Sequence, residues 1–217
     1  YEEGESFCCN IFVSYYGRKM LGNTRLTIRL FVGETVQAYD MYDIKEIQSG
    51  KVTNLITYSK VLPKTDKPQK MRLYASLDGD SFFAENEWEM YLFPKTKKKI
   101  PENTEILYNA EEEQLFSLLE QGKNIVLFGA EPFVTLPTSF RIALAGRSSG
   151  NLATVIYKHP ILNDFLHEGF CGWQFAGMLE GGSAVCFESD KAAFLPIIEV
   201  ASVHKCAVRQ AALFEYR

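Results

Sequence analysis

The chain has 217 residues, of which 47% are hydrophobic and 23% are charged, and its formal net charge is −4. This length allows one large or two modest domains, and the composition is ordinary for a globular protein. The negative charge argues against nucleic acid as a partner, and no apolar stretch approaches the roughly 20 residues of a membrane-spanning helix.

The opening residues, YEEGESFCCN, lack the basic and apolar regions of a signal peptide. Because the chain starts abruptly at Tyr1, we expect a fragment or a mature piece of a longer protein. The five cysteines are an odd number and form no CxxC pair, which predicts free thiols and neither a disulfide framework nor a zinc ribbon.

Residues 1–94 have the pattern of an antiparallel β-sandwich. Leu26, Ile28 and Leu30 alternate with polar residues, which places one face of a strand in the core and the other in water. Turn residues separate several such runs, as in a sandwich. The alternating runs are FCCNIFVSYY, TRLTIRLFV, VTNLITYSKVL, QKMRLYASL and EWEMYLF.

Residues 95–103 are predicted to be a linker. The stretch PKTKKKIPEN is rich in lysine and proline, has little apolar bulk, and lies where the hydrophobic period changes. Its lysine triplet is interpreted first as a solvated segment, with a polyanion-binding patch as the weaker alternative.

Residues 104–217 are predicted to form an α/β domain with a mostly parallel sheet. A strand around Ile106 is followed by Asn109 as a helix N-cap, by a stripe of leucines expected to be buried, and by Gly122 as the helix stop. The next run, NIVLF, is apolar without alternation, as in a strand covered on both faces. This strand, helix and strand indicate a right-handed parallel crossover. Further strands are expected at ATVIY, SAVCF, PIIEV and AALFEY, with a helix near Gly172 to Leu179.

No pattern in the chain predicts catalysis, a metal or a cofactor. GxSxG and GxCxG are absent, Ser139 lacks flanking glycines, and GRSSGN is not a phosphate-binding loop. The three histidines, His159, His167 and His204, have no metal-ligand spacing. Glu87 and Glu89 alternate along a strand and are interpreted as a solvent-facing row, whereas a pairing of Asp164 with Glu168 stays open.

The segment KHPILNDFLHEGFCGWQF contains the candidate ligand-binding residues. His159 precedes a proline and is expected to anchor backbone groups at a turn. Trp173 and Phe175 are interpreted as core residues, with stacking of Trp173 on a sugar as the alternative. The candidates for ligand binding are His159, His167, Trp173 and Gln174.

Five segments carry a resemblance to a known family. In chain order they are NEWEMYLFP, LPTSFR, HPILNDFLHEGFCGWQF, FLPIIEV and AALFEYR. Together they resemble the C-terminal region of certain bacterial glycoside hydrolase family 2 proteins, most strongly over residues 85–217. The resemblance implies an immunoglobulin-like sandwich followed by an α/β domain of the class I glutamine amidotransferase-like fold, without that fold's cysteine-based triad.

The resemblance also implies a role and a partner. In such β-galactosidase-like proteins the catalytic residues belong to a barrel that this chain lacks. The chain is therefore expected to be a non-catalytic accessory fragment that partners the barrel, gives structural support or weak carbohydrate contact, and works in the periplasm or outside the cell.

Three departures from the family pattern stand out. Gly172 occupies a position where the family more often has an acid, and Leu166 one where it more often has a proline, which weakens a ligand role for this loop. The family continues past the LFE of the last strand, whereas this chain stops at Arg217. The α/β domain is thus expected to be truncated or to end at an edge.

Two rival functions follow from the same residues. One is a free-standing α/β hydrolase with a site around GAEPF and residues 159–173. The other is a carbohydrate-binding module in which an exposed aromatic ring stacks on sugar. Its candidate rings are Trp173, Tyr15, Tyr16 and Trp88.

Overall fold

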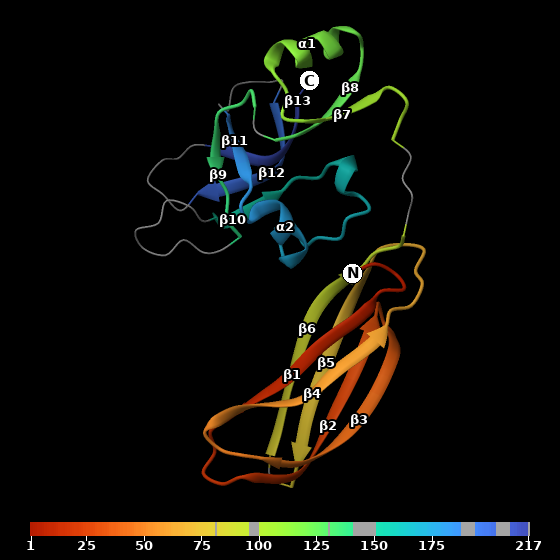
Figure 1. Cartoon of the computed structure of the whole chain (residues 1–217), viewed down its shortest axis with the longest axis vertical. Coiled ribbons are helices and arrows are strands. Elements are labelled where there is room, and N and C mark those ends of the chain that lie inside the picture. The colour runs from red at the N-terminus through yellow and green to blue at the C-terminus, as the bar shows by residue number, and fades with distance from the viewer. Residues whose placement is uncertain are drawn as a thin grey trace. The chain divides into compact units, whose positions relative to one another are not determined.

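The computed structural model describes residues 1–80, 82–95, 100–129, 131–140, 151–187, 194–202 and 209–216. It divides into two units (Figure 1). The first contains Tyr1–Thr96 with Asp164–Leu166, and the second contains Lys97–Asn163 with His167–Arg217. The lysine triplet of the predicted linker lies outside the described residues. None of the described helices has the length and apolar character needed to cross a membrane.

The first unit is a β-sandwich, which confirms the prediction for this part of the chain. One sheet is the antiparallel pair of β1 (Ser6–Tyr15) and β4 (Lys51–Val61). The other is antiparallel in the order β3-β2-β5-β6. Its strands are β2 (Leu21–Val32), β3 (Thr35–Ile47), β5 (Gln69–Gly79) and β6 (Phe82–Leu92). The immunoglobulin-like description stays a prediction.

Alternation along the strands builds the core of the sandwich. Leu26, Ile28 and Leu30 are all buried, as the sequence predicted, while Arg29 between them is exposed. Glu87 and Glu89 lie on the outer side of β6, which confirms the solvent-facing row. The buried core cluster comprises Phe7, Ile11, Leu26, Ile28, Leu30, Val32, Ile47, Tyr58, Leu62, Met71, Leu73, Ala75, Leu77 and Leu92.

One polar contact joins the two sheets of the sandwich. The buried Tyr58 on β4 donates its hydroxyl hydrogen to Asp40 Oδ2 on β3 at 2.9 Å, and Lys60 Nζ lies 3.1 Å from Asp40 Oδ1. Burial, and then the hydrogen bond to Asp40, raise the pKa of Tyr58. The Tyr58 hydroxyl therefore stays protonated, and its hydrogen bond to Asp40 satisfies a polar group that is buried in the core.

The second unit is built mainly on an antiparallel sheet, so the predicted α/β domain with a mostly parallel sheet is wrong. The order of the sheet is β10-β12-β13-β11-β9, and every neighbouring pair is antiparallel. Its strands are β9 (Thr135–Pro137), β10 (Asn151–Ile156), β11 (Ser183–Phe187), β12 (Phe194–Ser202) and β13 (Arg209–Tyr216).

The helical segments between the strands of this sheet are too short to connect parallel strands. A parallel connection needs a crossover of about a dozen or more residues, usually an α-helix. The helix predicted near Gly172 to Leu179 is a 3-10 turn, η2 (Trp173–Phe175), followed by a single turn of α-helix, α2 (Ala176–Leu179). Neither is long enough to cover the face of a sheet.

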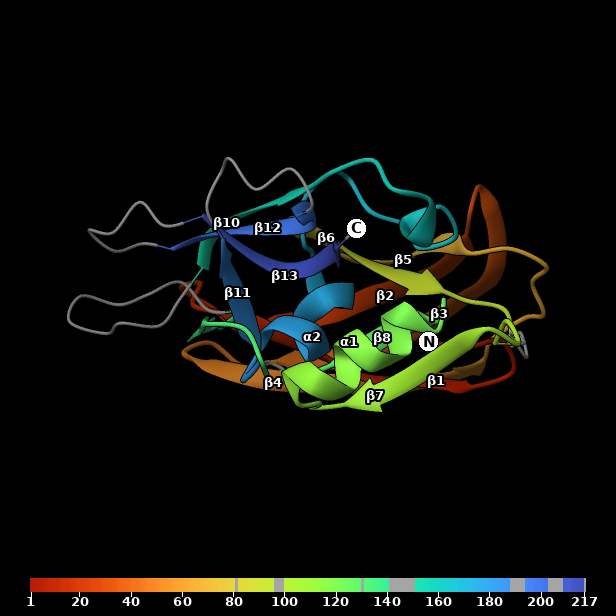
Figure 2. The ribbon, with the colours of Figure 1, turned by 90° about the horizontal axis from the view of Figure 1, so that it is seen from above.

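A separate strand-helix-strand element matches the predicted crossover. β7 (Thr104–Tyr108) pairs in parallel with β8 (Asn124–Phe128), and α1 (Glu112–Glu120) connects them. Figure 2 shows α1 beside β8. Gly122, with φ of +75°, follows the helix and confirms the predicted stop.

Three details of this element differ from the prediction. The strand β8 is not covered on both faces, because its residues alternate between exposed and partly buried. The N-cap is Glu111 and not Asn109, which instead adopts φ of +55° one residue after β7. The predicted leucine stripe is not buried, because Leu119 is 45% exposed and Leu115 and Leu118 are only partly covered.

Candidate functional site

The four predicted ligand residues all lie between β10 and β11. His159 precedes the 3-10 turn η1 (Pro160–Leu162), His167 follows that turn in a loop, and Trp173 and Gln174 belong to η2. These residues belong to the second unit. The hydrogen bonds and the exposure of each side chain determine whether it is available to bind a ligand.

His159 uses both ring nitrogens to hold the loop in place. Its Nδ1 accepts the backbone N–H of Ile161 at 3.3 Å, which makes it the cap of η1, as the sequence predicted. Its Nε2 lies 2.7 Å from Glu215 Oε2 on β13. Because Nδ1 accepts, a neutral ring carries its proton on Nε2 and donates it to Glu215. The ring therefore ties the turn to the sheet.

His167 makes the same local contact. Its Nδ1 accepts the backbone N–H of Gly169 at 3.1 Å, and Gly169 has φ of +89°, a conformation that glycine adopts without strain. Among the residues that the structure describes, no group of three His, Cys, Asp or Glu side chains could hold a metal ion. The third histidine, His204, lies outside those residues.

Trp173 and Phe175 have opposite environments although they are two residues apart. Phe175 is 3% exposed and belongs to the core, as predicted. Trp173 is 81% exposed, so the interpretation of this ring as a core residue is wrong. A 3-10 turn rotates successive side chains by about a third of a turn, so neighbouring positions face different directions.

A second aromatic ring lies against Trp173. The ring centroid of Phe140 is 4.9 Å from that of Trp173, with the planes tilted by 45°. Glu180, one residue beyond α2, accepts hydrogen bonds from Ser139 Oγ at 3.1 Å and from the backbone N–H of Phe140 at 3.0 Å. We call Trp173, Phe140, Ser139 and Glu180 the Trp173 site.

Two hydrogen bonds made by Thr138 hold the segment next to the Trp173 site in place. Thr138 is 3% exposed and donates its hydroxyl hydrogen to the carbonyl of Leu179 at 2.7 Å. The backbone N–H of Thr138 donates to the carbonyl of Gly182 at 2.9 Å. The segment that carries Phe140 is thereby fixed to the end of α2.

The Gln174 amide lies next to Gly172. A Cβ built on Gly172 would be 2.7 Å from Gln174 Oε1, so any side chain there would have to displace the amide. The acid that related sequences are expected to carry at this position is therefore incompatible with the Gln174 conformation seen here.

The structure also shows a polar cluster that sequence reasoning missed. Arg209 on β13 makes two bonds of 2.8 Å to the Glu199 carboxylate on β12, and Tyr157 donates to the same carboxylate at 2.6 Å. The hydrogen bond from Arg209, opposed by partial burial, lowers the pKa of Glu199, and the bond to Glu199 raises the pKa of Tyr157. No spacing in the sequence could reveal it, because the three residues come from β12, β13 and the segment after β10.

Burial leaves Cys9, Cys171 and Cys186 poorly suited to nucleophilic chemistry. Burial raises the pKa of Cys9, Cys171 and Cys186, which disfavours the reactive thiolate. All the described cysteines, including Cys8, are free thiols. Cys206 lies outside the described residues.

The fold and site define a mostly β protein of two units whose second unit presents an exposed tryptophan beside a partly buried phenylalanine. The chain belongs to the family described as "Domain of unknown function (DUF8487)", whose model matches residues 106–217. A second model, "Domain of unknown function (DUF8488)", matches residues 5–94. Neither description mentions a glycoside hydrolase. Comparison with curated proteins gives no significant match.

Proposed function

We propose that the chain is a non-catalytic accessory region of a bacterial family 2 glycoside hydrolase, of the β-galactosidase-like kind. It gives structural support to the catalytic barrel and weak contact to the carbohydrate substrate. The proposal rests on the resemblance of five segments to that family and on the Trp173 site. Trp173 lies in the longest of those segments, and Ser139 and Phe140 lie in LPTSFR.

The contact with sugar is proposed because the Trp173 ring is exposed to solvent. A tryptophan side chain that is 81% exposed leaves most of its apolar surface in water, and the nearby Phe140 extends that surface. Rimmed by polar groups, an exposed aromatic surface marks a binding site. Ser139 and Glu180 supply such polar groups beside the rings, where they can contact sugar hydroxyls.

The histidine contacts favour a structural role for the loop. A histidine that acts as a general base needs a ring nitrogen free to accept a proton from the substrate. In both His159 and His167 the accepting nitrogen of the neutral ring is already bonded to a backbone N–H. The loop is therefore built to hold the Trp173 site in place.

Tryptophan fluorescence tests the sugar contact directly. The chain has two tryptophans, so Trp88→Phe leaves Trp173 as the only tryptophan reporter. Titration of this variant with galactose and galacto-oligosaccharides should change the emission saturably. Trp173→Ala should weaken binding about ten-fold or more, measured by calorimetry in the otherwise native chain. Unchanged affinity in Trp173→Ala would remove the sugar contact from the proposal.

Two further measurements test the accessory role. The purified chain should not hydrolyse chromogenic glycosides or esters. The coding sequence around it should contain, in the same reading frame, a barrel with two carboxylate residues as catalytic acid and nucleophile. Turnover by the purified chain, with loss of that turnover in a matched variant, would overturn the proposal.

A carbohydrate-binding module is the second candidate, and the same exposed ring favours it. Of its other candidate rings, Tyr16 is 71% and Trp88 42% exposed, whereas Tyr15 packs edge-on against Phe82. Such a module binds sugar without its catalytic partner. Binding of the chain by itself to an insoluble polysaccharide, abolished by Trp173→Ala, would favour the module over the supporting region.

A further inference from the structure

The outer face of the four-stranded sheet holds an arginine between two tyrosines. Arg29 on β2 lies directly opposite Tyr39 on β3 and Tyr74 on β5 in the strand register. Its guanidinium carbon is 5.4 Å from the centre of one ring and 5.5 Å from the centre of the other. Two flanking rings attract the cation and restrict its side chain, so the guanidinium is held in one place without a carboxylate.

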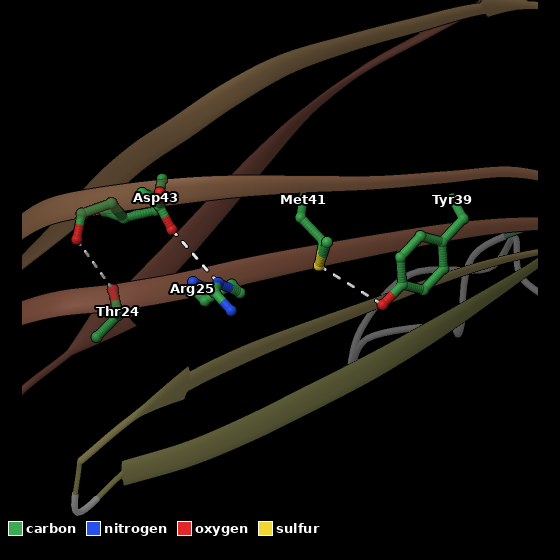
Figure 3. Close-up of polar contacts among 6 residues, drawn as sticks. Thr24, Arg25, Tyr39, Met41 and Asp43 are labelled. Carbon is green, nitrogen blue, oxygen red and sulfur yellow. Dashed lines mark hydrogen bonds and ion pairs between the residues drawn. The ribbon is translucent and has the colours of Figure 1, made fainter.

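The neighbouring cations of this face have acidic partners. Arg25 reaches across to Asp43 at 3.4 Å (Figure 3). Lys70 pairs with Glu89 at 2.6 Å, and Arg72 lies 3.7 Å from two glutamates. Among the described residues, Arg29 contacts the two rings and forms no ion pair. Its N–H donors remain available to a ligand that accepts two parallel hydrogen bonds, such as a carboxylate.

The surroundings of Arg29 decide which carboxylate fits. Thr27 lies on the same face of β2, between Met41 of β3 and the buried Ser76 of β5, so the Thr27 hydroxyl is the accessible polar group of the next row of the sheet. The Tyr39 hydroxyl turns toward Met41 Sδ at 3.6 Å (Figure 3). These groups suit a ligand whose remaining polar atoms are neutral hydroxyls.

The margins of the same face are acidic. Asp43 lies on β3, and Glu85 and Glu87 lie on β6, opposite Ser76 and Tyr74. Carboxylates on both sides repel a ligand that carries a row of negative charges, such as nucleic acid. A ligand with a single carboxylate on an otherwise neutral body meets less of this repulsion than a polyanion does.

We propose that Arg29, clamped between Tyr39 and Tyr74, binds the carboxylate of an acidic sugar of the uronic acid type. The guanidinium takes the carboxylate, and the tyrosine rings and the Thr27 hydroxyl lie beside the sugar ring. This site belongs to the first unit and does not depend on the Trp173 site.

Titration of the full chain with methyl β-D-glucuronide tests the site. In spectra of arginine Nε–Hε groups, the Arg29 signal, assigned by its loss in Arg29→Gln, should shift saturably. Methyl β-D-glucoside, which lacks the carboxylate, should leave it unmoved. Arg29→Gln should weaken glucuronide binding about ten-fold or more, because both parallel hydrogen bonds are lost.

Arg25→Gln is the matched control. It removes an arginine from the same strand and face, but one whose charge is already paired with Asp43. It should leave glucuronide binding within about two-fold, since an exposed ion pair contributes little. Arg29→Lys keeps the charge and the fold but loses the planar fork, and it should bind more weakly than the native chain.

Three results would overturn the proposal. One is equal binding of the glucoside and the glucuronide, and another is equal loss in Arg29→Gln and Arg25→Gln. The third is equal binding of N-acetylglutamate, which offers a carboxylate without a sugar ring. Unchanged amide spectra and melting temperature in Arg29→Lys confirm that any loss reflects the site and not unfolding.

Discussion

One carboxylate, that of Glu199 on β12, joins β13 to the residue that follows β10. It receives two bonds from Arg209 on β13 and one from Tyr157, and Arg209 also lies over the ring of Phe187, 4.8 Å from its centre. Both carboxylate oxygens therefore accept hydrogen bonds. Removing the carboxylate leaves both donors without this partner, which costs more than a typical hydrogen bond contributes.

We expect Glu199→Gln to lower the free energy of unfolding by about 1–3 kcal/mol at neutral pH, because hydrogen bonds to a charged group are lost. Urea unfolding measures the change. Tyr157→Phe is the matched control, since it removes a single bond and should cost less. An equal effect of the two substitutions would contradict the assigned role of the carboxylate.

The same cluster predicts how stability depends on pH. Hydrogen bonds from Arg209 hold the pKa of Glu199 below its ordinary value in the folded chain. The carboxylate therefore contributes stability above the ordinary glutamate pKa of about 4.3, and this contribution is lost as pH falls through the lower, folded value. The difference in unfolding free energy between the native chain and Glu199→Gln should shrink over that acidic range. A difference that stays constant down to pH 2, well below the ordinary glutamate pKa of about 4.3, would rule out this linkage.

At the scale of elements, α1 ends at a glycine that the backbone requires. Gly122 has φ of +75°, and a Cβ added there would have no atom within 4 Å. The cost of a substitution is therefore backbone strain and not a clash. Gly177, in α2, also has open space around its Cβ position but has no positive φ.

We expect Gly122→Ala to destabilise α1 locally by about 1 kcal/mol, because a residue with a Cβ is strained in the left-handed conformation. Faster hydrogen exchange of the α1 amides measures this effect. Gly177→Ala should be neutral or slightly stabilising, because it removes glycine from a helix without strain. Equal effects of Gly122→Ala and Gly177→Ala would show that the left-handed conformation of Gly122 does not determine the cost of the substitution.

The sequence predicted the position of most strands but not how those of the second unit pair. Runs such as SAVCF and AALFEY are apolar with little alternation, a pattern typical of buried parallel strands. Here β11 and β13 are neighbours in an antiparallel sheet with several partly buried side chains, so the same pattern arises without helical crossovers. Periodicity reports burial and carries no information on strand direction.

The candidate site was predictable only in part. The 158–175 segment was identified from its residue types, and the capping role of His159 followed from the proline after it. The exposure of Trp173 could not be predicted, because one residue in η2 separates an exposed ring from a buried one. The contact with Phe140 depends on a separate segment that Glu180 holds in place.

At the scale of the whole molecule, the first unit has a core of its own. Every buried member of its main cluster lies between Phe7 and Leu92, on the six strands of the sandwich or the loop before β5. A unit with a complete core can fold independently. A fragment of residues 1–95 should therefore give dispersed amide spectra and a cooperative thermal transition. A molten fragment, with strand content but poor dispersion, would show that the second unit completes the core.

His159 links two segments that are 56 residues apart in the chain. Its two nitrogens belong to one rigid ring, so the Ile161 amide and the Glu215 carboxylate are held at a fixed separation. The turn η1 therefore cannot slide along β13 unless one of these two hydrogen bonds breaks.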